Sequence, residues 1–416
     1  MSNNWFADKM SEEVSFEEIQ EKADRGDFHQ WNFEPFDFQE NGYEDVLDEI
    51  KKYTAVDYLK LDEERKKAEC DGNSEKAREY KAKMDKMVDD VLVIYRQKNI
   101  FPIQYFSDFG IIDEIEKCVA YKAFWNGNVV SCGAGVGTTL CNYLFPNLFD
   151  TPSQHDLDKT NARSLFEKFN NDDFLRRAIK FCFSYKNGCP VPTSVMGGLR
   201  LVGSAPTNFR PMNAKAVYER FCEPGGVIFD SSCGFGGRML GCLSSENNYR
   251  YVGCDPNTET MYHLHQLADY IEQVTGREDS YELHCCGSEV FKGPAESIDF
   301  AFSSPPYFDL EVYSDEPTQC YNKFPKLEDW LEGFVRGTIR NIVHMLKKGK
   351  YYAINIADFN TGGSMVAYVD EWIRISAEEG APLFDTVYLG VTARAGSKEQ
   401  AAGELKKENI LIFKKV

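Results

Sequence analysis

The tetrapeptide Ser-Pro-Pro-Tyr at residues 304–307 ends a short apolar run, IDFAFSS. The run has the composition of a buried strand, and a rigid diproline followed by an aromatic ring can clamp a planar amine. About 70 residues upstream, the segment VIFDSSCGFGG (227–237) is an apolar strand that ends in Asp230 and continues into a glycine-rich turn. Together the two segments indicate methyl-transfer chemistry.

The glycine-rich turn has the composition of a cofactor loop. Gly234 and Gly236 let the backbone approach a nucleotide-like molecule, and a helix that begins near Arg238 offers unpaired N–H groups. A second short apolar strand, YVGCDPN, contains Asp255, 25 residues after Asp230. In doubly wound folds an acid at this spacing binds ribose hydroxyls. The alternative is that Asp255 only caps its strand.

From residue 227 onward, strand-like segments alternate with amphipathic helical segments. The seven strand-like segments are VIFDSS, YVGCDP, YELHCCG, IDFAFSS, YYAINIAD, FDTVYLGV and NILIFKKV. Five strand-then-helix units predict a parallel sheet covered on both faces, and the last pair predicts a hairpin at one edge. We therefore predict an α/β fold with a doubly wound, seven-stranded, Rossmann-like sheet and a C-terminal antiparallel hairpin, preceded by a mainly helical N-terminal region.

The motifs D-S-S-C-G-F-G, C-D-P and S-P-P-Y, in this order, resemble those of the class I S-adenosylmethionine-dependent methyltransferases. More narrowly, they resemble the DNA amino-methyltransferases, which methylate adenine N6 or cytosine N4. The resemblance covers about residues 207–416 and implies S-adenosylmethionine as the cofactor. A serine at position 304 favours cytosine over adenine by a narrow margin. We accordingly divide the chain into a catalytic domain, 206–416, and an N-terminal region, 1–205, that is a candidate for target recognition or partner binding.

The resemblance implies seven cofactor-binding residues: Phe209, Pro211, Asp230, Gly234, Gly236, Asp255 and Glu289. The acid and the two glycines of the first loop would cradle the methionine and ribose, and Asp255 would hold the ribose hydroxyls. Glu289 would contact the adenine. Phe209 and Pro211, in the segment NFRP, would cover the methionine end.

The resemblance also implies that Ser304, Pro305, Pro306 and Tyr307 form the catalytic loop. An aromatic amine is a poor nucleophile because its lone pair is delocalised into the ring. Hydrogen bonds from the amine to the Ser304 oxygen and the Pro305 carbonyl would aim that lone pair, while Tyr307 stacks on the extruded base. The alternative for this motif is a proline turn after a strand.

The first hundred residues are acidic and have helical periodicity. A long charged run, LDEERKKAECDGNSEKAREYKAKMDK, predicts a solvated helical hairpin with its turn at 71–73. A partner-binding arm is the alternative. Because little room remains for target recognition within the catalytic half, we expect any such element in the N-terminal region.

The net charge of −19 argues against indiscriminate binding to nucleic acid. The stretch 159–220 is nevertheless basic, with eleven Lys or Arg against four acids. This stretch is a candidate DNA-binding or RNA-binding surface, and the alternative is a solvated helix face that happens to be basic.

Other cofactor and location signals are weak. The 13 cysteines and six histidines show no zinc-ligand spacing, so we expect no metal site, and reduced cysteines suit a cytoplasmic protein. No apolar stretch is long enough to span a membrane, and we expect no signal peptide. The glycine-rich stretch 131–139 lacks the lysine of a phosphate loop, which favours a structural turn over a second ligand loop.

Two alternative functions remain open from the sequence. Related P-P-Y loops also serve RNA guanine and the glutamine amide of proteins, so an RNA or protein methyltransferase is one alternative. The other is a binding protein with a methyltransferase-like half that has lost its activity.

Overall fold

The computed structural model describes residues 5–6, 12–31, 43–132, 135–152, 164–184, 188–201, 207–310, 312–361, 363–391 and 406–416. The chain forms two compact units. The first, the sheet unit, contains Met1–Phe28, Ile111–Leu148 and Thr207–Val416, and the second, the helical unit, contains His29–Gly110 and Phe149–Pro206. This grouping differs from a single division at residue 205. One reason is that the N-terminal segment pairs with the sheet unit through a bridge between Val14 and Cys285.

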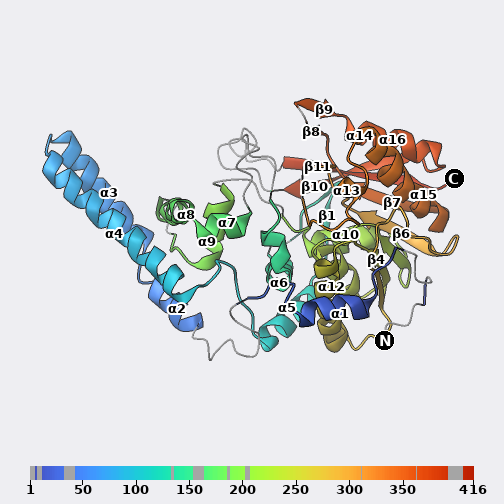
Figure 1. The fold of residues 1–416 in the computed structure, drawn as a ribbon, viewed down its shortest axis with the longest axis horizontal. Coiled ribbons are helices and arrows are strands. Elements are labelled where there is room, and N and C mark those ends of the chain that lie inside the picture. The colour runs from blue at the N-terminus through green and yellow to red at the C-terminus, as the bar shows by residue number, and fades with distance from the viewer. Residues whose placement is uncertain are drawn as a thin grey trace. The chain divides into compact units, whose positions relative to one another are not determined.

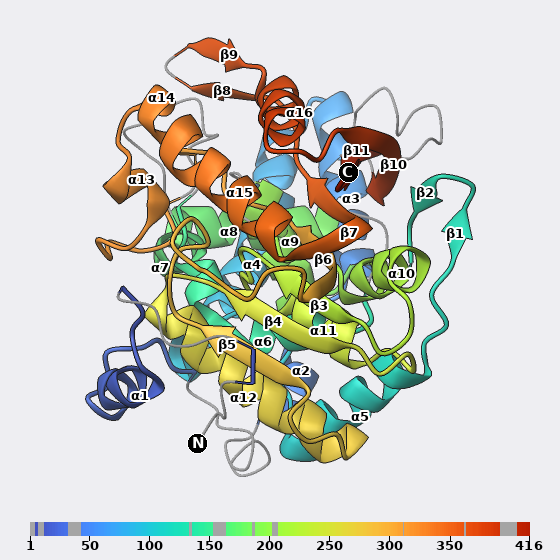
Figure 2. The ribbon, with the colours of Figure 1, turned by 90° about the vertical axis from the view of Figure 1, so that its right-hand side faces the viewer.

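In the described residues, the sheet unit has nine strands in the order β1-β2-β10-β11-β7-β6-β3-β4-β5 (Figure 2). Their bounds are β1 Trp125–Asn126, β2 Val129–Val130, β3 Val227–Asp230, β4 Arg250–Cys254, β5 Tyr281–His284, β6 Ile298–Ser303, β7 Leu346–Asn355, β10 Leu383–Val391 and β11 Lys406–Lys414. Strands β3 to β7 run parallel, and β11 pairs antiparallel with both β7 and β10. The predicted α/β fold with a C-terminal hairpin is confirmed.

Two features of the strands differ from the prediction. The short strands β1 and β2 extend the sheet beyond seven strands, because β2 pairs parallel with β10. In addition, β8 (Phe359–Thr361) and β9 (Ser364–Val366) form a separate hairpin. Helix α16 (Tyr368–Glu378) begins shortly after this hairpin.

Helices cover both faces of the sheet (Figure 2). Those between the strands are α10 Pro211–Phe221, α11 Gly237–Leu243, α12 Thr258–Thr275, α13 Cys320–Lys323, α14 Leu327–Trp330 and α15 Arg336–Met345. A π-helical turn, Leu331–Val335, joins α14 to α15. The sheet unit also contains α1 (Phe16–Asp24), α6 (Thr138–Leu144) and most of α5 (Asp108–Ala120).

The helix α12 shows how local sequence positions the site. The Asn257 side chain caps its first turn by accepting the backbone N–H of Thr260 at 3.0 Å. Apolar residues at helical spacing, Leu264, Leu267, Ala268 and Ile271, are all buried. The first residue of this helix, Thr258, consequently lies three residues after Asp255, at the carboxyl end of β4.

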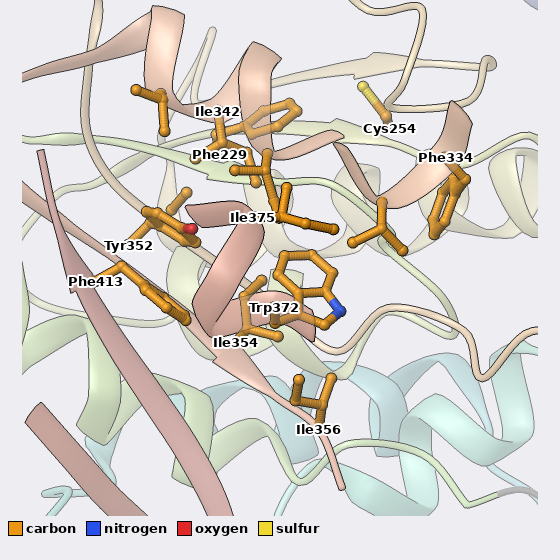
Figure 3. Packing of buried hydrophobic residues seen from close by; sticks show 14 of the residues in the cluster. Phe229, Cys254, Phe334, Ile342, Tyr352, Ile354, Ile356, Trp372, Ile375 and Phe413 are labelled. Atoms are coloured by element: carbon orange, nitrogen blue, oxygen red, sulfur yellow. The ribbon is translucent and has the colours of Figure 1, made fainter. Parts of the chain in front are cut away.

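A large apolar cluster packs α15 and α16 against one face of the sheet (Figure 3). Tyr352 and Ile354 alternate along β7 and so point to the same side, where Trp372 and Ile375 of α16 join the same cluster. The rings of Tyr352 and Phe413 stack with centroids 4.7 Å apart. This packing makes the sheet a rigid support for the loops at its carboxyl edge.

The helical unit contains α2 Tyr43–Ile50, α3 Ala55–Cys70, α4 Ser74–Lys98, α7 Leu165–Asn170, α8 Asp172–Ser184 and α9 Pro192–Leu201. The predicted helical hairpin is confirmed, because α3 and α4 lie side by side and are joined at residues 71–73 (Figure 1). Gly72 adopts a φ of 73° in the turn, and Asn73 caps α4 by accepting the Lys76 N–H.

Candidate functional site

The glycine-rich turn connects β3 to α11 and has a shape that side chains would obstruct. Gly234 and Gly236 have φ values of 55° and 73°. A Cβ on Gly236 would lie 2.6 Å from Leu267 and 2.7 Å from Phe145, and one on Gly237 would lie 2.0 Å from the Phe209 carbonyl oxygen. The turn therefore needs glycine for close packing as well as for its backbone conformation.

Asp255 joins the two predicted cofactor motifs. Its Oδ2 accepts the backbone N–H of Gly234 at 2.9 Å, and its Oδ1 accepts the N–H of Asn257 at 3.0 Å. Burial raises the pKa of Asp255 to about 6, while these two backbone hydrogen bonds oppose the rise. The carboxylate consequently lies where β4 ends and beside the glycine-rich turn.

Asp230 lies beneath the turn and is fully buried. Its carboxylate accepts hydrogen bonds of 2.8 Å from each of Arg238 Nε, Tyr251 Oη and Ser303 Oγ. Burial alone would lower the pKa of Arg238, but the Asp230 carboxylate raises it above its usual value. Both Asp230 oxygens thus bond protein groups, and the acid ties β3 to α11, β4 and β6.

Sequence reasoning did not identify these three partners of Asp230. Arg238 follows the acid by eight residues and was recognised only as the start of a helix. Nothing in the local sequence marks Tyr251 or Ser303, because strand order alone brings their side chains to the same acid. One feature of the sequence could have indicated that such partners exist. An acid at the end of a buried strand needs hydrogen-bond donors close to it.

The predicted catalytic loop, Ser304–Tyr307, begins where β6 ends, next to β3 in the sheet. The Ser304 hydroxyl donates a hydrogen bond to the Asn355 carbonyl oxygen at 3.1 Å. The Tyr368 hydroxyl donates to the Pro306 carbonyl oxygen at 3.2 Å. Pro305 is buried, whereas Ser304, Pro306 and Tyr307 remain partly exposed.

The ring of Tyr307 is held by two other aromatic rings. Its centroid lies 5.9 Å from that of Phe359 in β8, at 86°, and 5.8 Å from that of Tyr368 in α16, at 61°. Edge-to-face contacts of this kind fix the plane of the ring. Tyr307 is therefore oriented by elements that follow it in the sequence by more than fifty residues.

Phe209 and Pro211 lie in different environments. The Phe209 ring is edge-to-face with Phe302 at 5.4 Å, and the Arg238 guanidinium lies 5.7 Å from its centroid. Pro211 is buried at the first position of α10, which separates NFRP from the first predicted strand. The structure therefore brings Phe209 to the glycine-rich turn, while Pro211 packs between helices, against Gly241.

Glu289 follows β5 and forms an ion pair with Lys323, with Oε1 2.7 Å from Nζ. Its Oε2 is buried and has no hydrogen-bond partner among the described residues. A buried carboxylate oxygen without a donor is costly. This atom is therefore a candidate acceptor for a ligand.

Other sequence candidates have structural explanations. In the stretch 131–139, Gly137 is the N-cap of α6 with a φ of 74°, and its N–H donates to Glu114 at 2.9 Å. Residues 133–134 lie outside the described residues. Within the described ranges, no group of three or more His, Cys, Asp or Glu is arranged to hold a metal ion. None of the described helices has both the length and the apolar character to cross a membrane.

Many basic side chains of the stretch 159–220 are engaged within the protein. In the helical unit, Arg176 pairs with Asp89 at 2.8 Å and Lys180 with Asp85 at 3.0 Å. In the sheet unit, buried Lys215 donates to the carbonyl groups of residues 118, 119 and 244. Lys159, Arg163 and Lys186, which the basic stretch includes, lie outside the described residues.

No protein-family model matches the chain, and no curated protein matches it. Among solved structures, a methyltransferase from Pyrococcus furiosus is similar with 13% identity and a TM-score of 0.33, over 50% of this chain and 83% of that one. A SAM-dependent O-methyltransferase from Thermotoga maritima shares 11% identity over 52% of this chain and 69% of that one, with a TM-score of 0.34. TrmN from Thermus thermophilus shares 12% identity over 50% of this chain and 49% of that one, with a TM-score of 0.33. The similarity to these methyltransferases is distant and concerns the fold.

Proposed function

We propose that this protein transfers a methyl group from S-adenosylmethionine to the exocyclic amine of a DNA base, with cytosine N4 slightly favoured over adenine N6. The observation that carries the proposal is the position of the S-P-P-Y loop next to the glycine-rich turn. The Ser303 hydroxyl, one residue before the loop, donates to Asp230 at 2.8 Å, directly before the turn. A methyl donor bound at the glycine-rich turn and an amine bound at the S-P-P-Y loop would thus lie next to each other.

The residues at the strand ends fit the proposed cofactor. Asp255 offers carboxylate oxygens for ribose hydroxyls, and the unpartnered Glu289 Oε2 offers an acceptor for the adenine amine. Gly234 leaves the turn open where the methionine part would lie, because a Cβ there would meet no atom closer than 4.0 Å, whereas Gly236 allows close packing against Leu267 and Phe145. The cofactor supplies an electrophilic methyl group on a sulfonium, which requires no metal and no redox step.

Ser304 would position the amine through its oxygen lone pairs. Its hydroxyl proton is already directed to the Asn355 carbonyl at 3.1 Å, so the oxygen is left to accept a hydrogen bond from the substrate. The Pro305 carbonyl would accept a second one. With its two hydrogens held by the Ser304 oxygen and the Pro305 carbonyl, the nitrogen would move toward tetrahedral geometry, and its lone pair would point at the methyl group.

Tyr307 would stack on the flat face of the substrate. Its ring plane is set by Phe359 and Tyr368, so little rotamer freedom would be lost when the substrate binds. No general base with a tuned pKa is needed, because the nitrogen becomes acidic only once it is methylated and can then release its proton to water.

A protein amide is a second candidate substrate, and one observation favours it. The ion pairs of Arg176 and Lys180 with acids of α4 reduce the positive charge that the stretch 159–220 can offer to phosphates. A glutamine side chain also presents a planar NH2 group, in its amide, and a protein substrate needs no positively charged groove for phosphates.

One experiment distinguishes these substrates. The full chain is incubated with isotopically labelled S-adenosylmethionine and, separately, with duplex DNA, single-stranded DNA, RNA and a protein extract. The product is digested and identified by mass spectrometry, with Tyr307→Ala as the control. Labelled N4-methylcytosine or N6-methyladenine would support the proposal. Label in RNA or protein alone would contradict the DNA substrate, and no transfer to any acceptor would contradict the enzymatic function.

A further inference from the structure

The segment Tyr313–Lys323, which we call the roof segment, contacts all three strand ends that are proposed to hold the cofactor. The ring of Tyr313 lies 6.1 Å from that of Phe235 in the glycine-rich turn, which follows β3. After β4, the Asn257 side-chain amide donates to the Tyr313 carbonyl oxygen at 3.3 Å. After β5, Glu289 pairs with Lys323. The roof segment therefore follows the same edge of the sheet as the proposed cofactor site.

Glu316 anchors the middle of the roof segment to α12. Its Oε2 accepts the backbone N–H of Thr258, the first residue of that helix, at 3.1 Å, and its Oε1 accepts the Thr258 hydroxyl at 2.5 Å. A carboxylate at this position is stabilised by the positive end of the helix dipole. Nearby, the Thr318 hydroxyl donates to the carbonyl of Pro256, the residue next to Asp255.

The N-terminal segment Glu12–Asp24 fastens the roof segment at two places. Lys22 on α1 contacts Glu316 at 3.0 Å, and Glu12 contacts Lys323 at 2.8 Å. The N-terminal segment is itself attached to the sheet, because the Val14 N–H donates to the Cys285 carbonyl after β5 at 3.1 Å. Two ion pairs, between residues 294 and 311 positions apart, thus hold the roof segment.

We propose that the roof segment is part of the cofactor site and covers its adenosine end, and that the N-terminal segment holds it closed. This inference rests on the proposed function. Entry and exit of S-adenosylmethionine then require separation of the Lys22–Glu316 and Glu12–Lys323 pairs. Lys323 is a positioning residue, since its ion pair with Glu289 Oε1 orients the unpartnered Oε2 for the adenine amine.

The test measures how fast S-adenosylhomocysteine leaves the full chain. Stopped-flow displacement is carried out on the wild type, on Lys22→Met and on Glu316→Gln, which keeps the size of the side chain. Both variants should release the ligand about three- to tenfold faster, because each loses a partly buried charged hydrogen bond. Lys83→Met is the matched control, since Lys83 makes an exposed pair with Glu79 in the helical unit, and it should leave the rate unchanged.

Hydrogen exchange supplies a readout that does not depend on ligand release. In the wild type, S-adenosylhomocysteine should slow exchange in the roof segment, and Lys22→Met should speed it without ligand. Release at wild-type rates from both variants, or no ligand-dependent protection of the roof segment, would overturn the inference while leaving the proposed function intact. Failure of the wild type to bind S-adenosylhomocysteine would instead overturn the proposed function, and this inference with it.

Discussion

The carboxylate of Asp255 accepts the backbone N–H of Gly234 at 2.9 Å. This contact links the end of β4 to the turn after β3, and it holds both in place before any ligand arrives. Asp255 Oδ2 can accept a ribose hydroxyl in two ways. Either the glycine-rich turn moves and releases the Gly234 N–H, or the oxygen accepts the Gly234 N–H and the hydroxyl together. Asp255 is therefore at once part of the loop structure and the proposed ribose ligand.

Substitution of Asp255 should weaken cofactor binding more than it slows the chemical step. Asp255→Ala removes a charged acceptor, so we expect the Kd for S-adenosylmethionine to rise about tenfold or more, while kcat at saturating cofactor stays near the wild-type value. Calorimetric titration measures the Kd. The control is Asp113→Asn, since Asp113 is an exposed partner of Lys117 on α5.

The pH dependence of binding tests the same role. With a pKa of about 6, Asp255 becomes protonated as the pH falls below that value and loses an acceptor site. Cofactor affinity should accordingly decrease between pH 7 and about pH 5. Asp255→Asn should abolish this decrease, and a pH dependence that persists in the variant would assign it to another group.

Tyr307→Ala should abolish turnover with almost no change in cofactor affinity, because the ring is proposed to contact the methyl acceptor only. Tyr307→Phe keeps the stacking surface and should retain most of the activity. Steady-state kinetics and calorimetry on the two variants measure this. Loss of cofactor binding to the same extent in Tyr307→Ala and Asp255→Ala would contradict the assigned roles.

Ser304→Ala should lower kcat about ten- to a hundredfold through loss of an acceptor aimed at the reacting nitrogen. The KM for the cofactor should remain unchanged. Single-turnover rates with saturating substrate isolate this effect from product release. A wild-type rate in this variant would show that the Pro305 carbonyl alone positions the amine.

Gly237→Ala should disrupt the glycine-rich turn, because the added Cβ would lie 2.0 Å from the Phe209 carbonyl oxygen. We expect a lower melting temperature and weaker cofactor binding. Gly197→Ala is the matched control: Gly197 lies in α9, and its Cβ would meet no atom within 4 Å. That substitution should stabilise the helix by up to about 1 kcal/mol, as thermal unfolding can measure.

His284 should make stability depend on pH. Burial would lower its pKa, but the hydrogen bonds that its ring donates to the Glu13 and Glu282 carboxylates, each at 2.9 Å, raise it to about 9. Because the pKa of His284 is higher in the folded state than in the unfolded state, protonated His284 stabilises the fold. Its contribution to the free energy of unfolding is full below about pH 6.5 and is lost as the pH rises through about 9. It amounts to at most about 3 kcal/mol.

Urea unfolding between pH 6 and pH 10 measures this contribution. Glu13→Gln removes one of the two acceptors and should flatten the dependence of unfolding free energy on pH. The control Glu79→Gln changes an exposed pair in α4 and should leave the slope as it is. An unchanged slope in Glu13→Gln would show that His284 is not the titrating group.

The amino-acid sequence by itself determined the order along the chain of the seven predicted strands in residues 206–416, though not the short β8–β9 hairpin, and the position of the α3–α4 turn. Apolar runs, glycine turns and helix caps act over a few residues, so a local pattern is enough to predict them. The glycine-rich turn and the S-P-P-Y loop were recognised for the same reason, since each is a short segment that directly follows a strand.

Only the tertiary structure decided which side chains meet. The pairing of Lys22 with Glu316, the donors around Asp230, and the ion pairs that engage Arg176 and Lys180 all join residues from different elements. Such contacts depend on the order of strands in the sheet and on helix packing, which no spacing along the chain encodes. For the same reason, the N-terminal segment could not be assigned to the sheet unit until Val14 was found beside Cys285.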